Sequence, residues 1–368
     1  MKLTYASCLV LASVGPVAAQ APVTPKPPEA SAEFVETAAQ ADEPLAEQFS
    51  LTNAAKSLDA GAINFSQKHR CVQCHVNLMY LAARPALEKI VPSPADMRAF
   101  HEWIVETRWE KYGVIYDQWS KDQPAYQEKG ARLPATEPIV VAFGLATNDR
   151  ATTGKLHPST RVALDNVLAR QRPDGGFNVV TDGLGSFLNE FDQTMLAAIA
   201  VGSAPEPYPK TEPAKTLLAG VRRYVGDHAP QSTYQRGMLQ WAAVYVSDLA
   251  TPQQGASIVE ELRQLQRPGG GWCLSDLLTD DETNKTGKFA ASRPCDGYGT
   301  GFAVFALRNA GVSAHDPSLK QGIAWLKTNQ RASGRWFQSS FVGRPGNLIS
   351  NSATAWAVLA LAACGEVP

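Results

Sequence analysis

The sequence has no excess of charge of either sign and no long hydrophobic run beyond its first residues. Its 34 lysines and arginines balance 35 aspartates and glutamates, which leaves a net charge of −1. A balanced surface gives no electrostatic reason to expect nucleic acid or an anionic membrane as a partner. No later stretch holds the roughly 20 apolar residues that a membrane-spanning helix needs. The sequence therefore predicts neither nucleic-acid binding nor a membrane span.

Cysteine is also scarce, and the number left in the mature protein depends on whether a signal peptide is removed. The opening MKLTYASCLVLASVGPVAAQ has one lysine, a short apolar run and the small residues Val17-Ala18-Ala19. This order is typical of a secretory signal, so we expect a signal peptide over residues 1–19, cleavage after Ala19 and a periplasmic or secreted protein. Five of the six cysteines follow that point. In an oxidising compartment, an odd number leaves at least one thiol free or chemically committed.

Three segments follow the signal. Residues 20–48 are rich in Ala, Pro and Glu and poor in large apolar side chains, which predicts a disordered leader. Residues 49–76 form a short segment that contains Cys71-x-x-Cys74-His75. Residues 77–366 hold the remaining apolar periodicity, and a chain with 44% hydrophobic residues can bury a large core there.

Three short stretches share the pattern Gln-x-x-x-Gly-x-aromatic. Their residues are Gln171, Gly175 and Phe177; Gln266, Gly270 and Trp272; and Gln330, Gly334 and Trp336. Each stretch ends a segment whose apolar residues recur at three- and four-residue steps, the period of an amphipathic helix. Its glycine suits the left-handed conformation in which helices often end. Each is followed by a nearly uncharged helix that holds Thr194, Thr300 or Thr354.

The repeated unit is thus an amphipathic outer helix, a turn and an inner helix that is apolar on every face. A helix that is apolar all round must be buried all round. Repeats of this kind bury their faces only by stacking, and an open solenoid would leave one concave side in water. We therefore expect an all-α fold, an α/α toroid of about five or six helical hairpins.

The Gln-x-x-x-Gly-x-Trp turns resemble the QW repeats of the squalene–hopene cyclase and prenyltransferase superfamily. The resemblance covers roughly residues 77–364 and is strongest from residue 254, where GGWCLSDL, DGYGTGFAVFALRNAG and SGRWF follow in family order. It implies a terpenoid cyclase/prenyltransferase-like toroid in which each glutamine caps a helix end and the aromatic residue packs beside it. The Cys-x-x-Cys-His motif with LMYLAARPAL also resembles a branch of secreted bacterial squalene-cyclase-like proteins.

Cys71, Cys74 and His75 have the spacing of a haem c attachment site. Two thiols would add across the vinyl groups of the porphyrin, and the histidine would become the proximal ligand of the iron. A disulfide or redox pair is an alternative, although a thioredoxin-like pair needs a βαβ context in a chain that is read as helical. Zinc is another alternative, although no second ligand pair stands nearby. Export favours haem c as the cofactor, with Cys71, Cys74 and His75 as its binding residues.

The sequence does not identify the second axial ligand of such a haem. Met79 follows His75 too closely to reach the opposite face of the ring. Five other side chains are candidates: His69, Met97, His101, Met195 and Met238. Arg84, in LAARPAL, is either a contact for a haem propionate or a surface arginine in a salt bridge.

Two further sets of residues bear on other chemistries. Cyclases of the superfamily that start by protonation use an Asp-x-Asp-Asp motif, which this sequence does not contain. The nearest string, SDLLTDDET, makes Asp276, Asp280 and Asp281 the candidate acids, although a solvated acidic loop explains the same residues. We expect Cys273 and Cys295 to form a disulfide across the loop between them, which would add about 3 kcal/mol of stability.

These observations lead to one functional hypothesis and two alternatives. The hypothesis is an exported toroid with covalent haem c, acting near an apolar cavity. Its role would be electron transfer with a redox partner protein, or redox chemistry on a small hydrophobic ligand. The alternatives are a haem-free terpenoid cyclase-like enzyme and a non-enzymatic binding scaffold. The sequence leaves open whether the protein is an enzyme.

Overall fold

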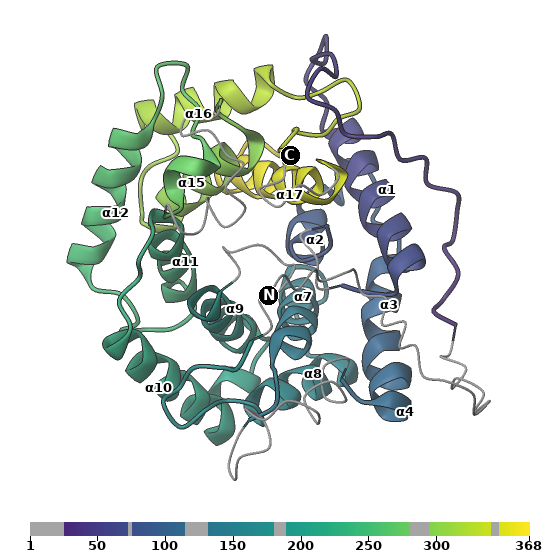
Figure 1. The fold of residues 1–368 in the computed structure, drawn as a ribbon, viewed down its shortest axis with the longest axis vertical. Helices are drawn as coiled ribbons and strands as arrows, with labels where there is room; N and C mark the ends of the chain where they lie inside the picture. Colours follow the sequence, from purple (N-terminus) through teal and green to yellow (C-terminus); the bar gives the residue numbers. More distant parts are fainter. Residues whose placement is uncertain (1–25, 73–75, 115–131, 180–188, 280–293, 340–345) are drawn as a thin grey trace, which may run out of the picture.

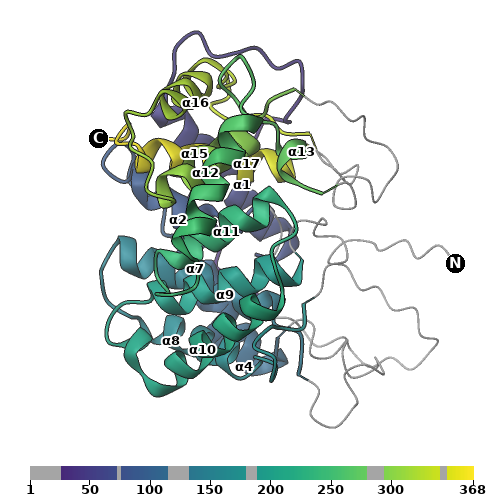
Figure 2. The same cartoon turned by 90° about the vertical axis from the view of Figure 1, so that its left-hand side faces the viewer.

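The computed structural model describes residues 26–72, 76–114, 132–179, 189–279, 294–339 and 346–368. The regular elements in these ranges are helices, with no strand among them. They form a ring of helix pairs, seen face-on in Figure 1 and edge-on in Figure 2. None of the helices in the described ranges has both the length and the apolar character needed to cross a membrane. The expected all-α toroid is confirmed.

Six outer helices form the rim of the ring in the described residues. They are α1 (Leu51–His69), α3 (Asp96–Trp103), α8 (Pro158–Leu168), α10 (Glu212–Asp227), α12 (Pro252–Leu265) and α16 (Pro317–Thr328). The second of them continues through the π-helical stretch η2 (Ile104–Trp109) into α4 (Glu110–Tyr112). Outer helices bury one face, as in α12, where the buried residues are Ile258 and Leu262. This is the amphipathic pattern expected of them.

Six inner segments surround the ring axis in the same described residues. They are α2 (Tyr80–Ala83) with the 3₁₀ turn η1 (Arg84–Leu87), α7 (Thr136–Ala151), α9 (Glu190–Ser203), α11 (Thr233–Ala243), α15 (Gly297–Asn309) and α17 (Gly346–Ala363). Each contacts the next, and α17 contacts α2, so the inner ring is closed. The uncharged helices are buried on all sides, as α9 is from Phe191 to Val201. Two short elements, η3 (Tyr208–Lys210) and α13 (Leu274–Leu277), lie in connections.

The glutamine of each predicted turn ties its helix pair to the next outer helix. Its Nε2 donates one hydrogen bond to the carbonyl of the glycine in the same turn, at 2.8 or 2.9 Å. It donates a second to a carbonyl near the start of the next outer helix. These second bonds join Gln171 to Leu217 (3.0 Å), Gln266 to Ser318 (2.9 Å) and Gln330 to Ser50 (2.9 Å). The glutamine thus serves the next helix in the ring.

The glycine of each turn lies against the backbone of the same outer helix. The three glycines, Gly175, Gly270 and Gly334, have φ of +95°, +87° and +90°, a conformation that glycine adopts without strain. A Cβ on any of them would stand closer than 3.0 Å to the backbone of Gly220, Gln321 or Asn53, respectively. Each of these neighbours follows by three positions the carbonyl that the glutamine bonds. The three contacts are therefore one joint repeated around the ring.

The aromatic residue fastens the turn to its own helix pair. Trp272 and Trp336 are fully buried. Their indole N–H groups donate to the preceding outer helix, and their backbone N–H groups donate to a threonine of the following inner helix. The partners are Leu262 (2.6 Å) and Thr300 (3.0 Å) for Trp272, and Leu326 (2.8 Å) and Thr354 (3.2 Å) for Trp336. Thr300 and Thr354 thus connect inner helices to turns, whereas Thr194 donates to the carbonyl of Glu190 in its own helix.

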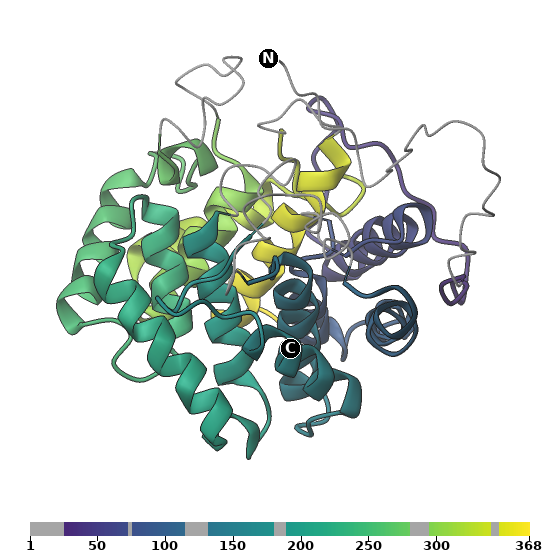
Figure 3. The same ribbon diagram turned by 60° about the horizontal axis from the view of Figure 1, so that its bottom comes forward.

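The third joint closes the ring. Ser50 is the N-cap of α1, and its N–H donates to Oε1 of Gln330 at 2.8 Å while its carbonyl accepts from Nε2 of the same residue. Helix α1 thereby packs beside the last turn, just as α10 packs beside the turn of Gln171 and α16 beside the turn of Gln266. Helix α17 contacts α1 here, and Figure 3 shows the yellow helix beside the purple one. The domain boundary expected at residue 77 falls inside the first helix pair, between α1 and α2.

The described part of the leader, residues 26–48, runs outside α1 toward the ring-closing joint (Figure 1). Main-chain hydrogen bonds pair its C-terminal part with the last turn, and side chains of α1 donate to carbonyls nearer its N-terminal end. These bonds run from Ala46 N to Gln330 O (2.8 Å), Ala332 N to Pro44 O (2.9 Å), Asn64 Nδ2 to Phe34 O (2.7 Å) and Gln67 Nε2 to Pro28 O (2.7 Å). Hydrogen bonds therefore connect residues 28–46 to α1 and to the last turn.

Replacing Gly334 with Ala tests the ring-closing joint, and Gly311→Ala is the matched control. Both glycines have positive φ, but a Cβ at Gly311 would meet no atom within 4 Å. We expect Gly311→Ala to lower the free energy of unfolding by about 1 kcal/mol, the cost of a left-handed alanine. Gly334→Ala should cost at least about 3 kcal/mol, because α1 must also move. Urea unfolding measures both, and equal losses would show that the close approach to α1 contributes nothing.

Candidate functional site

The Cys-x-x-Cys-His motif stands in the connection between α1 and α2, the outer and inner members of the first helix pair. In the pairs that start with α8, α12 and α16, this connection is the Gln–Gly–aromatic turn. The connection that contains the motif therefore corresponds to a turn of the other pairs. We call the face of the ring where the inner helices begin the turn face. Cys71 is 1% exposed, whereas Cys74 and His75 lie outside the described residues.

Hydrogen bonds from three helix pairs fix the backbone on both sides of the motif. They join Arg108 Nη1 of η2 to the carbonyl of Arg70 (2.8 Å), Asn77 Nδ2 to the carbonyl of Cys71 (3.1 Å) and Asn351 Nδ2 of α17 to the carbonyl of Val76 (2.7 Å). Arg108 is itself ion-paired with Glu137 in the first turn of α7. The motif is thus held between the first, second and last pairs of the ring.

Two of the candidate axial ligands pack next to the motif. Met97 Sδ accepts a hydrogen bond from Ser66 Oγ at 3.0 Å, and Asn77, which holds Cys71, donates to the same hydroxyl at 3.2 Å. His101 Nδ1 donates to the carbonyl of Met97 at 2.7 Å. Burial lowers the pKa of His101 to about 4, so its imidazole is neutral near pH 7. Both side chains already have a part in the packing beneath the motif.

The other three candidate ligands lie on α1, α9 and α11. His69 stacks on Phe65 near the end of α1, with ring centroids 4.4 Å apart. Met195 and Met238 are buried on α9 and α11, further round the inner ring from α2. Hydrogen bonds through Ser66 therefore link Met97 to Asn77, while His69 lies two positions before Cys71 in the chain.

Arg84 is a buried brace between α1 and η1. Its guanidinium is 1% exposed and pairs with Asp59 through Nε–Oδ1 (2.8 Å) and Nη2–Oδ2 (3.1 Å). It also donates to the carbonyls of Val91 and Pro92, and Tyr80 donates to Asp59 at 2.6 Å. All three nitrogens of Arg84 are engaged by these partners. The expectation of a propionate contact or a surface salt bridge is therefore wrong, because the salt bridge is internal.

Aromatic side chains meet at the ring axis. The ring of Trp241 on α11 contacts those of Phe143 on α7, Phe305 on α15 and Trp356 on α17, with centroids 5.5, 5.2 and 5.6 Å apart. Because α9 separates α7 from α11, and α15 separates α11 from α17, these contacts reach across the ring. Trp241 lies near the end of α11. Aromatic side chains therefore fill the axis at the level of Trp241.

Nearer the turn face, a buried carboxylate acts electrostatically on Tyr298, which bonds a second tyrosine. Asp192 is the third residue of α9 and is 0% exposed. The hydroxyls of Tyr234 and Tyr298, near the starts of α11 and α15, are 3.0 Å apart. Burial raises the pKa of Tyr298, and the negative charge of Asp192 raises it further. A carboxylate shielded from water beside aromatic rings can transfer a proton or stabilise a cation. Sequence reasoning missed Asp192.

The acids that the sequence singled out belong to the connection after Trp272. Asp276, in α13, forms an ion pair with Arg267 (2.6 Å), and its side chain is 14% exposed. Asp280 and Asp281 lie outside the described residues. Within the described ranges, no three His, Cys, Asp or Glu side chains gather closely enough to hold a metal ion together.

The structure brings the expected disulfide partners together. Cys273 directly follows Trp272, and Cys295 directly precedes Asp296, the N-cap of α15. Their Sγ atoms lie 3.5 Å apart. The contact with Cys295 raises the pKa of Cys273. The pair would join the turn to the inner helix of the same hairpin.

Comparison with known proteins identifies the C-terminal third of the chain. Residues 242–348 and 298–368 match the family model described as the squalene–hopene cyclase C-terminal domain. The squalene–hopene cyclase of Bradyrhizobium diazoefficiens is 31% identical over 123 residues, 32% of this chain and 16% of that protein. A probable squalene–hopene cyclase of Sinorhizobium fredii is 34% identical over 76 residues, 19% of this chain and 12% of that protein. The matched part spans less than a fifth of either relative.

Solved structures give a weaker likeness over more of the chain. The apo structure of the type II terpene cyclase MstE from Scytonema has a TM-score of 0.45 at 12% identity, covering 86% of this chain and 100% of that one. A polysaccharide lyase has a TM-score of 0.30 at 13% identity, covering 86% and 89%. Neither score assigns the fold, which rests on the closed ring of helix pairs. The likeness to squalene–hopene cyclases rests on residues 242–368.

Mass spectrometry of the unreduced protein tests the Cys273–Cys295 disulfide. After export, we expect proteolysis to release these two cysteines in one linked peptide. Replacing both with Ser should lower the free energy of unfolding by about 3 kcal/mol, because the unfolded chain loses a cross-link. Cys364→Ser is the control for loss of a thiol. Alkylation of both Cys273 and Cys295 without reductant would contradict the pairing.

Proposed function

We propose that the chain is an exported haem c protein built on a squalene-cyclase-like toroid. The observation that carries the proposal is the position of Cys71-x-x-Cys74-His75, where two thiols and an imidazole replace the turn of the first helix pair. This donor set suits a haem, since it offers two thioether attachments and one nitrogen ligand. When bound, the haem would supply electron transfer or ligand binding at iron.

The residues that flank the motif would hold the attachment loop in place. Asn77, Arg108 and Asn351 bond the backbone before and after it, and in the closed ring these bonds would keep an attached group in one position. Cys71 is almost fully enclosed by the folded chain. A porphyrin approaching the closed ring would not reach this sulfur, so we expect attachment to precede ring closure.

The neighbours of the motif bear on the type of reaction. Met97 would have to give up its bond from Ser66 to bind an iron atom. His101 would keep its bond to the carbonyl of Met97, since that bond uses Nδ1 and the iron would take Nε2. A haem with His75 as its one protein ligand would suit redox chemistry on a small ligand, and one that also took His101 would suit electron transfer with a partner protein.

Periplasmic expression with a haem-maturation system tests the attachment. We expect a covalent haem band on a denaturing gel that is lost in Cys71→Ala/Cys74→Ala. The matched double variant Cys273→Ala/Cys295→Ala should keep it. A shift of the visible spectrum with carbon monoxide would report an open axial position. A colourless protein in which Cys71 and Cys74 form a disulfide would overturn the proposal.

Acid–base chemistry on a terpenoid is a second candidate, and Asp192 favours it. The relatives are named as squalene–hopene cyclases, and the matched residues 242–368 include Tyr298 beside Asp192. The carboxylate is buried, and the aromatic rings of the axis are suited to stabilise a carbocation. Under this proposal Asp192 is the acid, and Asp276 keeps its ion pair with Arg267.

Incubation with squalene and shorter linear isoprenoids, followed by gas chromatography and mass spectrometry, tests this second candidate. We expect cyclic products from the unaltered protein. Asp192→Asn should lower their rate of formation at least about 100-fold, because the proton donor is removed. Asp276→Asn, at the other acid, should leave the rate unchanged. The candidate fails if the unaltered protein forms no cyclic product or if both variants lose activity equally.

A further inference from the structure

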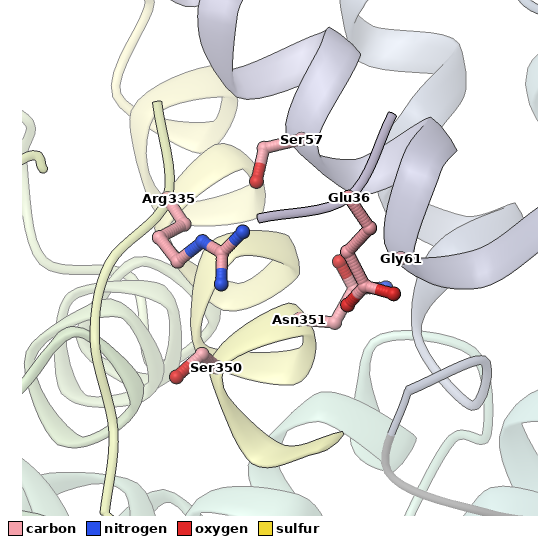
Figure 4. A pocket seen from close by; sticks show the side chains of 6 residues that line it. All are labelled: Glu36, Ser57, Gly61, Arg335, Ser350 and Asn351. Carbon is pink, nitrogen blue, oxygen red and sulfur yellow. The ribbon is translucent and has the colours of Figure 1, made fainter. Parts of the chain in front are cut away.

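A small polar pocket lies where the leader passes α1 and α17, away from the aromatic residues of the ring axis. Figure 4 shows its lining, which is Glu36 of the leader, Ser57 and Gly61 of α1, Arg335 of the last turn, and Ser350 and Asn351 of α17. Its volume is about 10 Å³, about enough for one water molecule. The pocket holds one buried cation and polar groups from four segments.

Arg335 is a buried cation for which the described residues supply no ion pair. The residue is 6% exposed. Its Nη2 donates to the carbonyl and the hydroxyl of Thr37, at 2.6 and 3.0 Å. Within the described residues, Nε has no hydrogen-bond partner and the guanidinium forms no salt bridge. Burial lowers the pKa of Arg335, and the negative charges of Glu43 and Glu36 act in the opposite direction. A buried charge of this kind is stabilised by a hydrogen-bonded counter-ion.

The rest of the lining also suits a negative group. In Figure 4 the hydroxyl of Ser57 extends toward the guanidinium of Arg335, and Glu36 lies on the opposite side. Ser350 is in the second turn of α17, an 18-residue helix whose N-terminal end carries partial positive charge. Gly61 leaves space beside the pocket, since a Cβ there would stand 2.7 Å from Asn351 Oδ1. Glu36 is the one anionic residue of the lining.

We propose that this pocket binds the oxyanion of a carboxylate or phosphate group, with Arg335 as its counter-charge. A planar guanidinium pairs with such a group through two parallel N–H donors. Nε of Arg335 supplies one donor that has no other partner. Because the pocket holds only about one water molecule, the ligand enters as Glu36 moves aside with the leader. Glu36 is therefore the group with which the ligand competes.

The oxyanion has two sources that differ in how they reach the pocket. One is a free carboxylate or phosphate compound in solution. The other is a carboxylate of a group anchored at the Cys-x-x-Cys-His motif, because Asn351 lines the pocket and also holds the carbonyl of Val76, which follows His75. The second source rests on the proposed haem attachment, and the first does not.

Thermal unfolding of the haem-free variant Cys71→Ala/Cys74→Ala tests the pocket directly. Sodium phosphate or acetate is titrated against sodium chloride at constant ionic strength. We expect phosphate or acetate to raise Tm saturably and chloride to have no such effect. In the same background, Arg335→Gln should weaken the apparent affinity at least tenfold. Glu36→Gln should strengthen it, because the competing carboxylate is removed.

Arg331→Gln is the matched control, since Arg331 lies in the same turn and also bonds the leader, at the carbonyl of Glu43. It should keep the response to oxyanions, which separates loss of the pocket from loosening of the leader. Arg335→Lys retains a cation and should keep part of the response. Circular dichroism confirms that each variant is folded. A haem-free protein whose Tm does not respond, or an Arg335→Gln variant that responds like Arg331→Gln, overturns the proposal.

The haem-loaded protein distinguishes the two sources. If it no longer responds while the haem-free variant does, a carboxylate of the bound group occupies the pocket. If both respond, the ligand is a free oxyanion. Both results support the site. Should the chain fail to take up haem, the proposed function fails while the haem-free titration still decides this inference.

Discussion

The hydrogen bonds between Gln330 and Ser50 join the two ends of the ring, and the other contacts of the fold depend on that closure. The two residues are 280 positions apart, and closing so long a loop costs only slightly more entropy than closing a shorter one. The joint repeats the geometry of the turns at Gln171 and Gln266, with a glycine against the backbone of the next outer helix. Without it, the apolar sides of α1 and α17 would face water.

Ring closure also determines where chemistry can occur. At the level of Trp241 the axis is filled by aromatic side chains from four inner helices. The residues that could take part in binding or catalysis lie instead toward the turn face. They are the connection that contains the Cys-x-x-Cys-His motif, the buried Asp192 and the pocket of Arg335. Asn351 contributes to two of them, because it lines the pocket and bonds the residue after His75. A displacement of α17 at the ring-closing joint would therefore also displace the backbone that follows the motif.

The sequence predicted the parts of the fold that follow from local pattern. The Gln–Gly–aromatic turns were identifiable because each combines a helix end with a glycine of positive φ. The uncharged helices indicated burial on all sides. The role of α1 as an outer helix was not predictable in this way, because the turn of its pair is replaced by the Cys-x-x-Cys-His motif. Its place is set by Gln330, whose partner at Ser50 has no sequence signature.

The candidate site was predicted in part, for related reasons. The spacing of Cys71, Cys74 and His75 is visible in the sequence. The pairing of Cys273 with Cys295 could also be predicted from it. Asp192 was missed because it stands alone in an apolar helix, where only the ring brings it close to Tyr298. The buried ion pair of Arg84 was missed because nothing local marks Asp59, 25 positions away, as its partner. In each case the missing information was a contact between distant segments.

Native-state hydrogen exchange of the amides of α1 tests the closed ring most directly. If the ring is one cooperative unit, buried amides of α1, such as those of Leu58 and Ile63, should exchange with the same free energy as those of α15. That value should equal the free energy of global unfolding. Exchange of α1 through local opening at a markedly lower free energy, while α15 stays protected, would contradict the account. It would mean that the first helix is attached to the toroid without completing it.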